Sequence, residues 1–349
     1  MKTTFVSTQA VSNATRLSMI KMQSELAKAS KEMSSGRLAD VGMGLGSRTG
    51  HAVQLRQELS QINTILDTNG LVKSRLDTAQ AALDGLLGTA EEFLGTLITV
   101  RDGSAGGLVV KSQANLNLKG LIGTLNANMN GQHLFAGTNT DVMPMLDYEV
   151  APPSAAKAAI DLAFSTRFGF PQTSPLVSTI DAADMTNFLE NEFAALFDDP
   201  EWGNLWSDAS DQNIRSRIST NELIETSANV NERAFRQMTM AYAMVGEFAV
   251  ENLQGGAFKA LADKALEAVS GALEGLTGIQ ARLGVAQNRV ANASERLTIQ
   301  RDIMSQQIVG LESVDLFETS TRVNTLMSQV ELSYSLTARI RQLSLLKYM

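Results

Sequence analysis

The chain has 349 residues and a formal net charge of −8, and it contains no cysteine. Its length allows two or three domains, while the lack of cysteine excludes disulfides, thiolate zinc sites and thiol nucleophiles. The first residues lack the apolar core of a cleaved secretory signal, and no run approaches the roughly 18 apolar residues of a membrane-spanning helix. We therefore expect any export of the chain to use another route.

The N-terminal segment carries apolar side chains at steps of three and four from Met19 to Met33, which predicts an amphipathic helix. The glycine-rich stretch 42–46 that follows predicts a loop or hinge. It follows a helix instead of a strand and does not match a dinucleotide-binding fingerprint, so a hinge is favoured over phosphate binding.

Residues 55–97 predict a long helix with a coiled-coil seam, because ten of thirteen positions stepped by four and three are apolar. The sequence Arg-Asp-Gly-Ser at 101–104 is expected to end this helix. A second helix is expected to run to about Met129, where Asn130 and Gly131 stop it.

The segment from Gln132 to Asp141 predicts a short strand, a Gly/Asn turn and a return strand. All six prolines of the chain then fall between positions 144 and 200. Because proline removes a backbone donor and clashes with the preceding turn, the proline-free arms can form long helices and this middle segment cannot.

Charged residues are also distributed unequally between this middle segment and the two arms. Residues 144–234 carry 15 acidic and five basic side chains, whereas the two arms together carry 22 acidic and 24 basic ones. An acidic insert repels nucleic acid and anionic membranes, and nearly neutral arms suit helix packing.

Within this insert we expect proline-bounded strands and one helix that is capped at Asp181 and stopped at 198–200. Alternation at 214–219 predicts a strand leading back, with helix resuming near Asn231. In the carboxyl arm, eleven of fifteen stepped positions from Ala262 to Leu311 are apolar, which predicts a second long helix. A new stripe from Leu316 predicts a terminal helix, and its nearest partner is the N-terminal helix.

Few residues are candidates for a catalytic or metal-binding site. His51 and His133 are the only histidines, and nothing in the pattern brings them together as a dyad or metal site. The carboxylates Asp198, Asp199 and Glu201 match no calcium-loop spacing. We therefore predict no catalytic, metal or cofactor site. The apolar stripes, together with 15 methionines, indicate packing surfaces.

The two arms resemble those of the bacterial flagellin-like axial proteins. The resemblance rests on Ser35, Gly36 and Arg37 after the first helix, and on Arg282, Gly284 and Asn288 in the carboxyl arm. Glu312 and Asp315 resemble the acidic pair before that family's last helix, and residues 343–346 resemble its closing segment.

The segment 131–140, with Phe135, Gly137 and Thr138, is similar to a motif of the hook-associated members of this family, which join hook and filament. Flagellins usually lack the motif in that form. The family's Asn-x-Pro-x-Asp-Asp-Pro element is missing here and is replaced by the glycine-rich stretch 42–46. The acidic insert carries no family signature.

The expected fold is mainly α: a long antiparallel coiled-coil helical bundle formed by the N- and C-terminal arms, with a β-hairpin and an inserted α+β outer domain. From the resemblance, residues 1–45 and 312–349 form an inner coiled-coil layer. Residues 46–143 and 235–311 form a helical rod domain with the hairpin, and residues 144–234 form the acidic outer domain.

The resemblance implies a non-enzymatic junction protein of the extracellular bacterial flagellum, exported without a cleaved signal peptide. It implies self-assembly, the first hook-associated protein and flagellin as neighbours, and an export chaperone, with no nucleic acid and no membrane insertion. The residues expected to form the assembly interface are Phe5, Val6, Leu17, Met19, Met22, Leu26, Val323, Met327, Val330, Tyr334 and Ile340.

Three alternatives stay open at this point. A filament-forming flagellin shares both arms. A cytoplasmic coiled-coil adaptor shares the heptads but needs neither the 131–140 motif nor two amphipathic termini. An enzyme requires a convergent polar pocket, for which the insert offers carboxylates but no histidine, cysteine or nucleophile motif.

Overall fold

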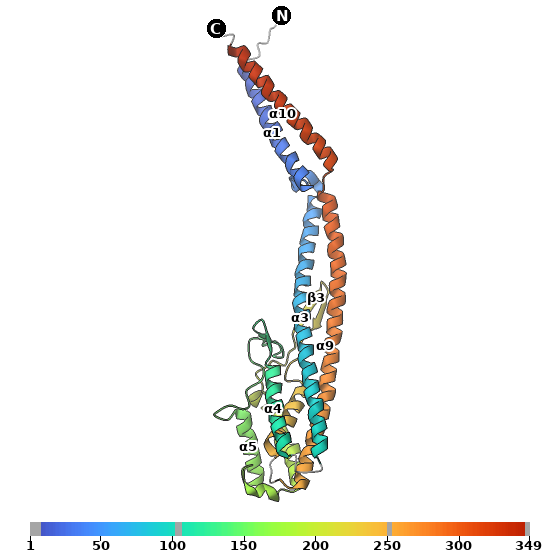
Figure 1. Ribbon diagram of the computed structural model, residues 1–349. Coiled ribbons are helices and arrows are strands. Elements are labelled where there is room, and N and C mark those ends of the chain that lie inside the picture. The colour runs from blue at the N-terminus through green and yellow to red at the C-terminus, as the bar shows by residue number, and fades with distance from the viewer. Residues whose placement is uncertain (1–7, 102–106, 250–252, 346–349) are drawn as a thin grey trace. The chain divides into compact units, whose positions relative to one another are not determined.

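A computed structural model describes residues 8–101, 107–249 and 253–345 (Figure 1). The chain divides into two compact units. Unit 1 comprises the residues up to Thr64 together with those from Thr298 onward, and unit 2 comprises Ile65–Leu297. Long helices dominate both units, and two small antiparallel strand pairs complete the fold, so the predicted mainly α class with helical arms is confirmed.

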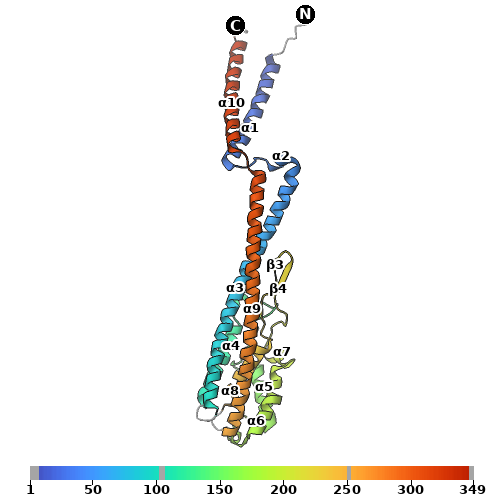
Figure 2. The same ribbon diagram turned by 90° about the vertical axis from the view of Figure 1, so that its right-hand side faces the viewer.

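Two of the helices are very long, as the seams predict. Helix α3 spans Thr49–Val100 and α9 spans Gly255–Glu312. In unit 2 they lie side by side in both views and run antiparallel (Figures 1 and 2). The apolar seam positions of each helix are buried, as at Leu76, Leu83, Leu276 and Leu283, or half-buried, which confirms the predicted packing faces.

The register of α3 against α9 is marked by polar residues that interrupt the two seams. The side-chain amide of Asn69 donates to Ser294 Oγ at 3.0 Å, and that of Gln80 donates to the carbonyl of Gln280 at 2.8 Å. All four are seam positions that the heptad steps identify as non-apolar. Asn69 is only 1% exposed, so a shift of either helix would leave its amide without these partners in an apolar environment.

Helix α4 spans Gly107–Leu125 and ends one turn before the predicted stop at Met129. Asn128–Met129 form strand β1, which pairs with β2 at Gln132–His133. The turn between them uses Asn130 and Gly131, whose φ angles are 55° and 80°. The predicted hairpin at 132–141 is therefore wrong in register: its turn lies at 130–131, and residues 134–141 form a loop.

The insert contains more helix than predicted. Its elements are α5 (Ala155–Phe168), η3 (Pro175–Thr179), α6 (Ala182–Phe188), η4 (Leu189–Phe193), η5 (Ala194–Phe197), α7 (Glu201–Leu205), β3 (Arg215–Ser219) and β4 (Glu222–Glu225). Asp181 caps α6 through a 2.8 Å bond from the Asp184 amide, as predicted. Strand β3 and the resumption of helix in α8 (Arg233–Phe248) are also confirmed.

Helix α5 was not predicted, and the proline-bounded strands expected there are wrong. Pro152 and Pro153 stand just before the N-cap Ser154, whose hydroxyl accepts from Lys157 N at 3.2 Å. Proline at that place removes no helical hydrogen bond, so it precedes a helix without opposing it. Among the described residues of the insert, β3 and β4 are the only strands, and they pair antiparallel.

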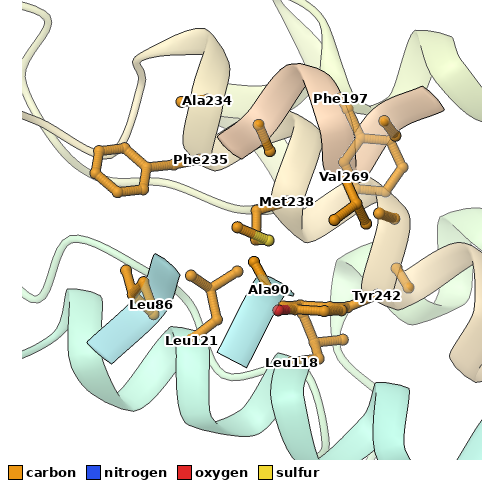
Figure 3. Close-up of a cluster of buried hydrophobic side chains, with 14 of the residues drawn as sticks. Leu86, Ala90, Leu118, Leu121, Phe197, Ala234, Phe235, Met238, Tyr242 and Val269 are labelled. Carbon is orange, nitrogen blue, oxygen red and sulfur yellow. The ribbon is translucent and has the colours of Figure 1, made fainter. Parts of the chain in front are cut away.

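One hydrophobic core joins the insert to the long helices of unit 2. Figure 3 shows side chains of α3, α4, α8 and α9 meeting around Met238, with Phe197 of the insert among them. An aromatic cluster continues this core, with ring centroids 5.7 Å apart for Phe164 and Phe188 and 5.3 Å apart for Phe193 and Phe248. The insert therefore packs on α8 through buried rings.

A buried carboxylate of α8 also binds a side chain of α5. Glu247 is 8% exposed and accepts from Tyr148 Oη at 2.8 Å and from Lys157 Nζ at 2.5 Å. Burial, and then the neighbouring charge of Glu247, raise the pKa of Tyr148, so this hydroxyl stays protonated and donates. The charged hydrogen bonds offset the desolvation of Glu247.

Candidate assembly surface

The two terminal helices form an antiparallel pair within unit 1. Helix α1 spans Thr8–Ser35 and α10 spans Leu316–Leu345, and they lie side by side in both views (Figures 1 and 2). Gln23 Nε2 donates to Tyr334 Oη at 2.7 Å, and Glu32 lies 3.7 Å from Arg322. The structure thus confirms that each terminal helix takes the other as its partner.

This helix pair buries few apolar side chains. Ala29, Val323 and Val330 are buried between the helices, at 2%, 9% and 9% exposure. In contrast, more than half of the exposed large apolar side chains of the described residues lie in unit 1, although it is the smaller unit. Those of α1 and α10 are Leu17, Ile20, Met33, Leu316, Phe317, Met327, Leu332, Tyr334 and Leu336.

Phe317 is the most exposed of these, at 85%. It lines an open groove of about 550 Å³ on α10, and the rest of the lining is Glu318, Thr321, Arg322, Thr325, Leu326 and Gln329. An exposed apolar side chain rimmed by polar residues is typical of a region that another protein covers.

The predicted interface residues occupy different environments. Val323 and Val330 are buried within a single chain, and Met19, Met22 and Leu26 are half-buried. Leu17, Met327 and Tyr334 are exposed. Phe5 and Val6 lie outside the described residues, as does the side chain of Ile340. The heptad steps did not select Ile20, Phe317, Leu332 and Leu336, although apolar residues off the main stripe of a helix were a signal that could have found them.

The segment that follows α1 meets the segment that precedes α10. Gly36 adopts a φ of 68°, and its carbonyl accepts from Val314 N at 3.1 Å. Leu38 N donates to the carbonyl of Glu312 at 2.9 Å, and Arg37 forms a β-bridge with Ser313. The Ser-Gly-Arg motif of one arm thus pairs with the acidic motif of the other.

The acidic pair has two distinct roles in this joint. The Glu312 side chain is 1% exposed and lies 2.7 Å from Arg56 Nη2, so an arginine of α3 compensates a buried carboxylate. Asp315 accepts from Phe317 N at 2.8 Å and from Glu318 N at 3.2 Å, and so caps the first turn of α10.

The predicted hinge at 42–46 is wrong as a loop. Val41–Leu45 form the short helix α2, and Gly46–Arg48 form the turn η1. The Asp40 side chain caps α2 by accepting from Met43 N at 3.0 Å. At Gly44 a Cβ atom would lie 2.8 Å from the Leu38 side chain, so the glycine permits a close approach within a helical turn.

In unit 2 the motif 131–140 ties the insert to the helices. Phe135 is fully buried and packs edge-on against Phe235 of α8, with centroids 5.8 Å apart. Its carbonyl accepts from Val230 N at 3.0 Å, and Ala136 forms a β-bridge with Asn229. The motif therefore holds the segment that leads from β4 into α8.

The second half of the motif holds another part of the insert. Gly137 has a φ of 62°, and a Cβ there would lie 2.4 Å from the carbonyl oxygen of Ser210. Thr138 Oγ1 donates to Ser210 Oγ at 2.9 Å, and Ser210 N donates to the Ala136 carbonyl at 3.1 Å. Only glycine combines this backbone conformation with so close a contact.

The motif residues of α9 have different surroundings. Arg282 forms a 2.6 Å ion pair with Glu232, directly before α8, and Gly284 lies against Gln80 of α3. Asn288 is exposed.

The described residues contain no cluster of three or more carboxylate or imidazole side chains able to hold a metal ion. Asp199 pairs instead with Arg236 at 3.0 Å. His133 Nδ1 lies 2.9 Å from the Asn126 carbonyl, and His51 is exposed on α3. In the part of the chain that is described, no helix is long and apolar enough to cross a bilayer.

Comparison with known proteins agrees with this architecture. Residues 6–140 match the bacterial flagellin N-terminal helical region, and residues 266–349 match the bacterial flagellin C-terminal helical region. The chain belongs to the bacterial flagellin family of axial proteins. It is a self-assembling, non-enzymatic structural component of the extracellular flagellum.

Two solved structures are similar to this chain at low sequence identity, and the first of them shares its fold. A protein from Vibrio parahaemolyticus, described as a flagellar hook-associated protein, is 11% identical with a TM-score of 0.52, over 75% of this chain and 96% of that chain. FlgL from Bacillus cereus is 11% identical with a TM-score of 0.49, over 73% of this chain and 98% of that chain. A search of proteins with curated descriptions found no match.

Replacing Phe317 with serine is expected to weaken assembly without destabilising the subunit. The side chain is 85% exposed in the single chain, so its loss changes the free energy of unfolding by less than about 0.5 kcal/mol. Burial of a phenylalanine contributes about 1.5–3 kcal/mol, so assembly needs roughly 10–100 times more protein. The amount of the chain recovered in isolated flagella measures this shift. Leu162→Ser, at a 67% exposed site of α5, is the matched control, and an equal effect of both would contradict the prediction.

Replacing Arg56 with alanine is expected to destabilise the joint of unit 1. The substitution leaves the buried Glu312 carboxylate without its counter-charge, which lowers the free energy of unfolding by about 1–3 kcal/mol. This loss is smaller than that for a fully buried ion pair because Arg56 is half-exposed. Amide hydrogen exchange in α10 should accelerate accordingly. Lys28→Ala, which removes the exposed 3.5 Å pair with Glu25 in the same unit, should leave exchange unchanged.

Replacing Gly137 with alanine is expected to lower the free energy of unfolding of unit 2 by about 3 kcal/mol. The left-handed conformation costs about 1 kcal/mol, and the clash with the Ser210 carbonyl adds about 2. Denaturant unfolding followed by tryptophan fluorescence measures the loss. At Gly131, where φ is also positive but no atom lies within 4 Å of an added Cβ, the same substitution should cost only about 1 kcal/mol. Equal losses at the two positions would exclude the clash.

Proposed function

We propose that the protein is the hook–filament junction subunit of the flagellum, corresponding to hook-associated protein 3. The observation that carries this proposal is the motif 131–140. It is similar to the motif of hook-associated members, and flagellins usually lack it in that form. The fold shared with a protein described as hook-associated is compatible with this assignment.

The geometry of the motif gives it a structural purpose. Phe135, Ala136 and Gly137 bind two separate segments of the insert, at 208–212 and 229–230. The insert therefore keeps a fixed attachment to α3, α4 and α8. A junction between two different polymers requires such a subunit, because contacts on both sides must keep one geometry.

The assembly surfaces belong to the terminal helices. Exposed apolar side chains of α1 and α10, including Leu17, Met327 and Phe317, are the residues that become buried between subunits in this proposal. On the hook side the neighbour is the first hook-associated protein, and on the filament side it is flagellin. Export proceeds through the flagellar channel, with an export chaperone covering the terminal helices beforehand.

Domain roles follow the same scheme. Residues 1–45 and 312–349 form the inner coiled-coil layer, 46–143 and 235–311 form the rod, and 144–234 form the acidic outer part. The alternative is a flagellin, which would polymerise into long filaments alone, whereas a junction subunit would stay largely monomeric until its neighbours are present.

A strain from which this gene is deleted separates the two functions. If the chain is the junction subunit, the strain makes hooks but sheds unpolymerised flagellin into the medium, because filament growth has no base. Immunoblots of medium and of isolated hooks measure this, with the complemented strain as control. Normal filaments in the deletion strain would exclude the junction, and complete loss of flagellin protein would identify the chain as the filament subunit.

A further inference from the structure

In addition to its contacts with the insert, the 131–140 motif lines a groove in unit 2. The groove has a volume of about 430 Å³ and lies between α3, the motif and the β3–β4 pair. Its lining combines two arginines with several hydroxyl groups, and no carboxylate is among the lining residues. The polar lining that matters here is Arg75, Thr138, Thr140, Arg215, Ser216 and Thr226.

Most of these groups are held in place by bonds within the chain. Arg75 donates to Gln132 Oε1 at 2.8 Å and to the His133 carbonyl at 3.3 Å. Ser216 Oγ and Thr226 Oγ1 lie 2.7 Å apart across the strand pair. The walls of the groove are thus pre-organised, which lowers the entropic cost of binding.

Arg215 differs from Arg75 because its guanidinium has no partner. Among the described residues it makes neither an ion pair nor a side-chain hydrogen bond. Its cross-strand neighbour Glu225 is exposed, forms no ion pair with it and does not line the groove. An arginine in this position can donate two parallel hydrogen bonds to a carboxylate.

The charge of the chain indicates where that carboxylate comes from. The segment 144–234 has 15 acidic residues and only five basic ones, and Arg215 is one of the five. Members of this family self-assemble, so each copy stands beside others that carry the same acidic segment. A cationic groove on an acidic segment is complementary to the acidic surface of its neighbour.

We propose that this groove binds a carboxylate side chain from segment 144–234 of a second copy of the chain, with Arg215 as the principal donor. The contact fixes the lateral arrangement of neighbouring subunits. The proposal requires only that copies of the chain self-assemble. It would therefore still hold if the deletion experiment excluded the junction role.

The test uses flagella isolated from cells whose only copy of the gene carries Arg215→Lys. A carbodiimide joins an amine to a carboxylate that touches it, and the substitution places an amine in the groove. We expect covalent dimers of the chain in which the peptide containing position 215 is joined to a peptide of segment 144–234. Mass spectrometry of the dimer band identifies the linkage.

The matched control is Arg217→Lys, two residues along the same strand and outside the groove, where Arg217 bonds to the Thr220 carbonyl. Dimer linkage from position 215 should exceed that from position 217 by about fivefold, the ratio that an ion pair of about 1 kcal/mol gives. Linkage only within one chain, for example to Glu225, would overturn the proposal, and so would linkage to a different flagellar protein.

A second measurement does not depend on how efficiently the lysine amine at position 215 reacts with the carbodiimide-activated carboxylate. Arg215→Gln should lower the amount of the chain recovered in isolated flagella by about fivefold relative to Arg217→Gln. Both sites are exposed and glutamine places no second negative charge opposite Glu225, so the two variants should unfold at the same denaturant concentration as the parent chain. Equal recovery of the two variants, together with no dimers from position 215, would refute the groove as a contact between copies.

Discussion

The antiparallel register of α3 and α9 is the constraint on which unit 2 depends. An apolar seam alone allows two helices to slide by a heptad, because every step offers similar contacts. Here Asn69 donates to Ser294 and Gln80 donates to the Gln280 carbonyl, so only this register gives both side-chain NH2 groups these acceptors. Asn69 also donates to the Ile218 carbonyl at 3.0 Å, and Arg289 pairs with Glu222, so the β3–β4 pair attaches to this register.

The two units differ in how completely each buries its own apolar residues. Unit 2 concentrates nearly all its phenylalanines and both tryptophans in one core, which joins the insert to the helices. In unit 1 the α1–α10 pair buries a thin seam and leaves Phe317, Met327 and Leu332 in solvent. A two-helix pair cannot enclose all its apolar side chains, so burial of the rest requires further subunits. The incomplete core of the terminal helices is therefore the feature on which the proposed assembly interface rests.

Short motifs act in this protein as joints between segments that are distant in sequence. The Ser-Gly-Arg motif pairs with the backbone beside Glu312, and Asp315 caps the helix that starts there. The 131–140 motif likewise bonds to residues near 210 and 230. In each case a glycine with positive φ turns the chain, and backbone hydrogen bonds complete the contact. At Gly36 only the backbone conformation opposes a side chain, whereas at Gly137 the conformation and the available space both do.

The sequence by itself determined the helical arms, because heptad spacing and the absence of proline depend on local geometry. It also determined the Asp181 cap, strand β3 and the pairing of the terminal helices. Helix α5 and the helical turn at 41–45 depend on local caps by Ser154 and Asp40, signals that the neighbouring prolines and glycines obscure in the sequence. The tertiary structure decided the hairpin register, because Phe135 and Ala136 bond to residues 229–230 instead of completing a hairpin. It also decided which apolar residues stay exposed, because the stripe pattern selects both Val323 and Met327, yet packing buries Val323 and leaves Met327 exposed.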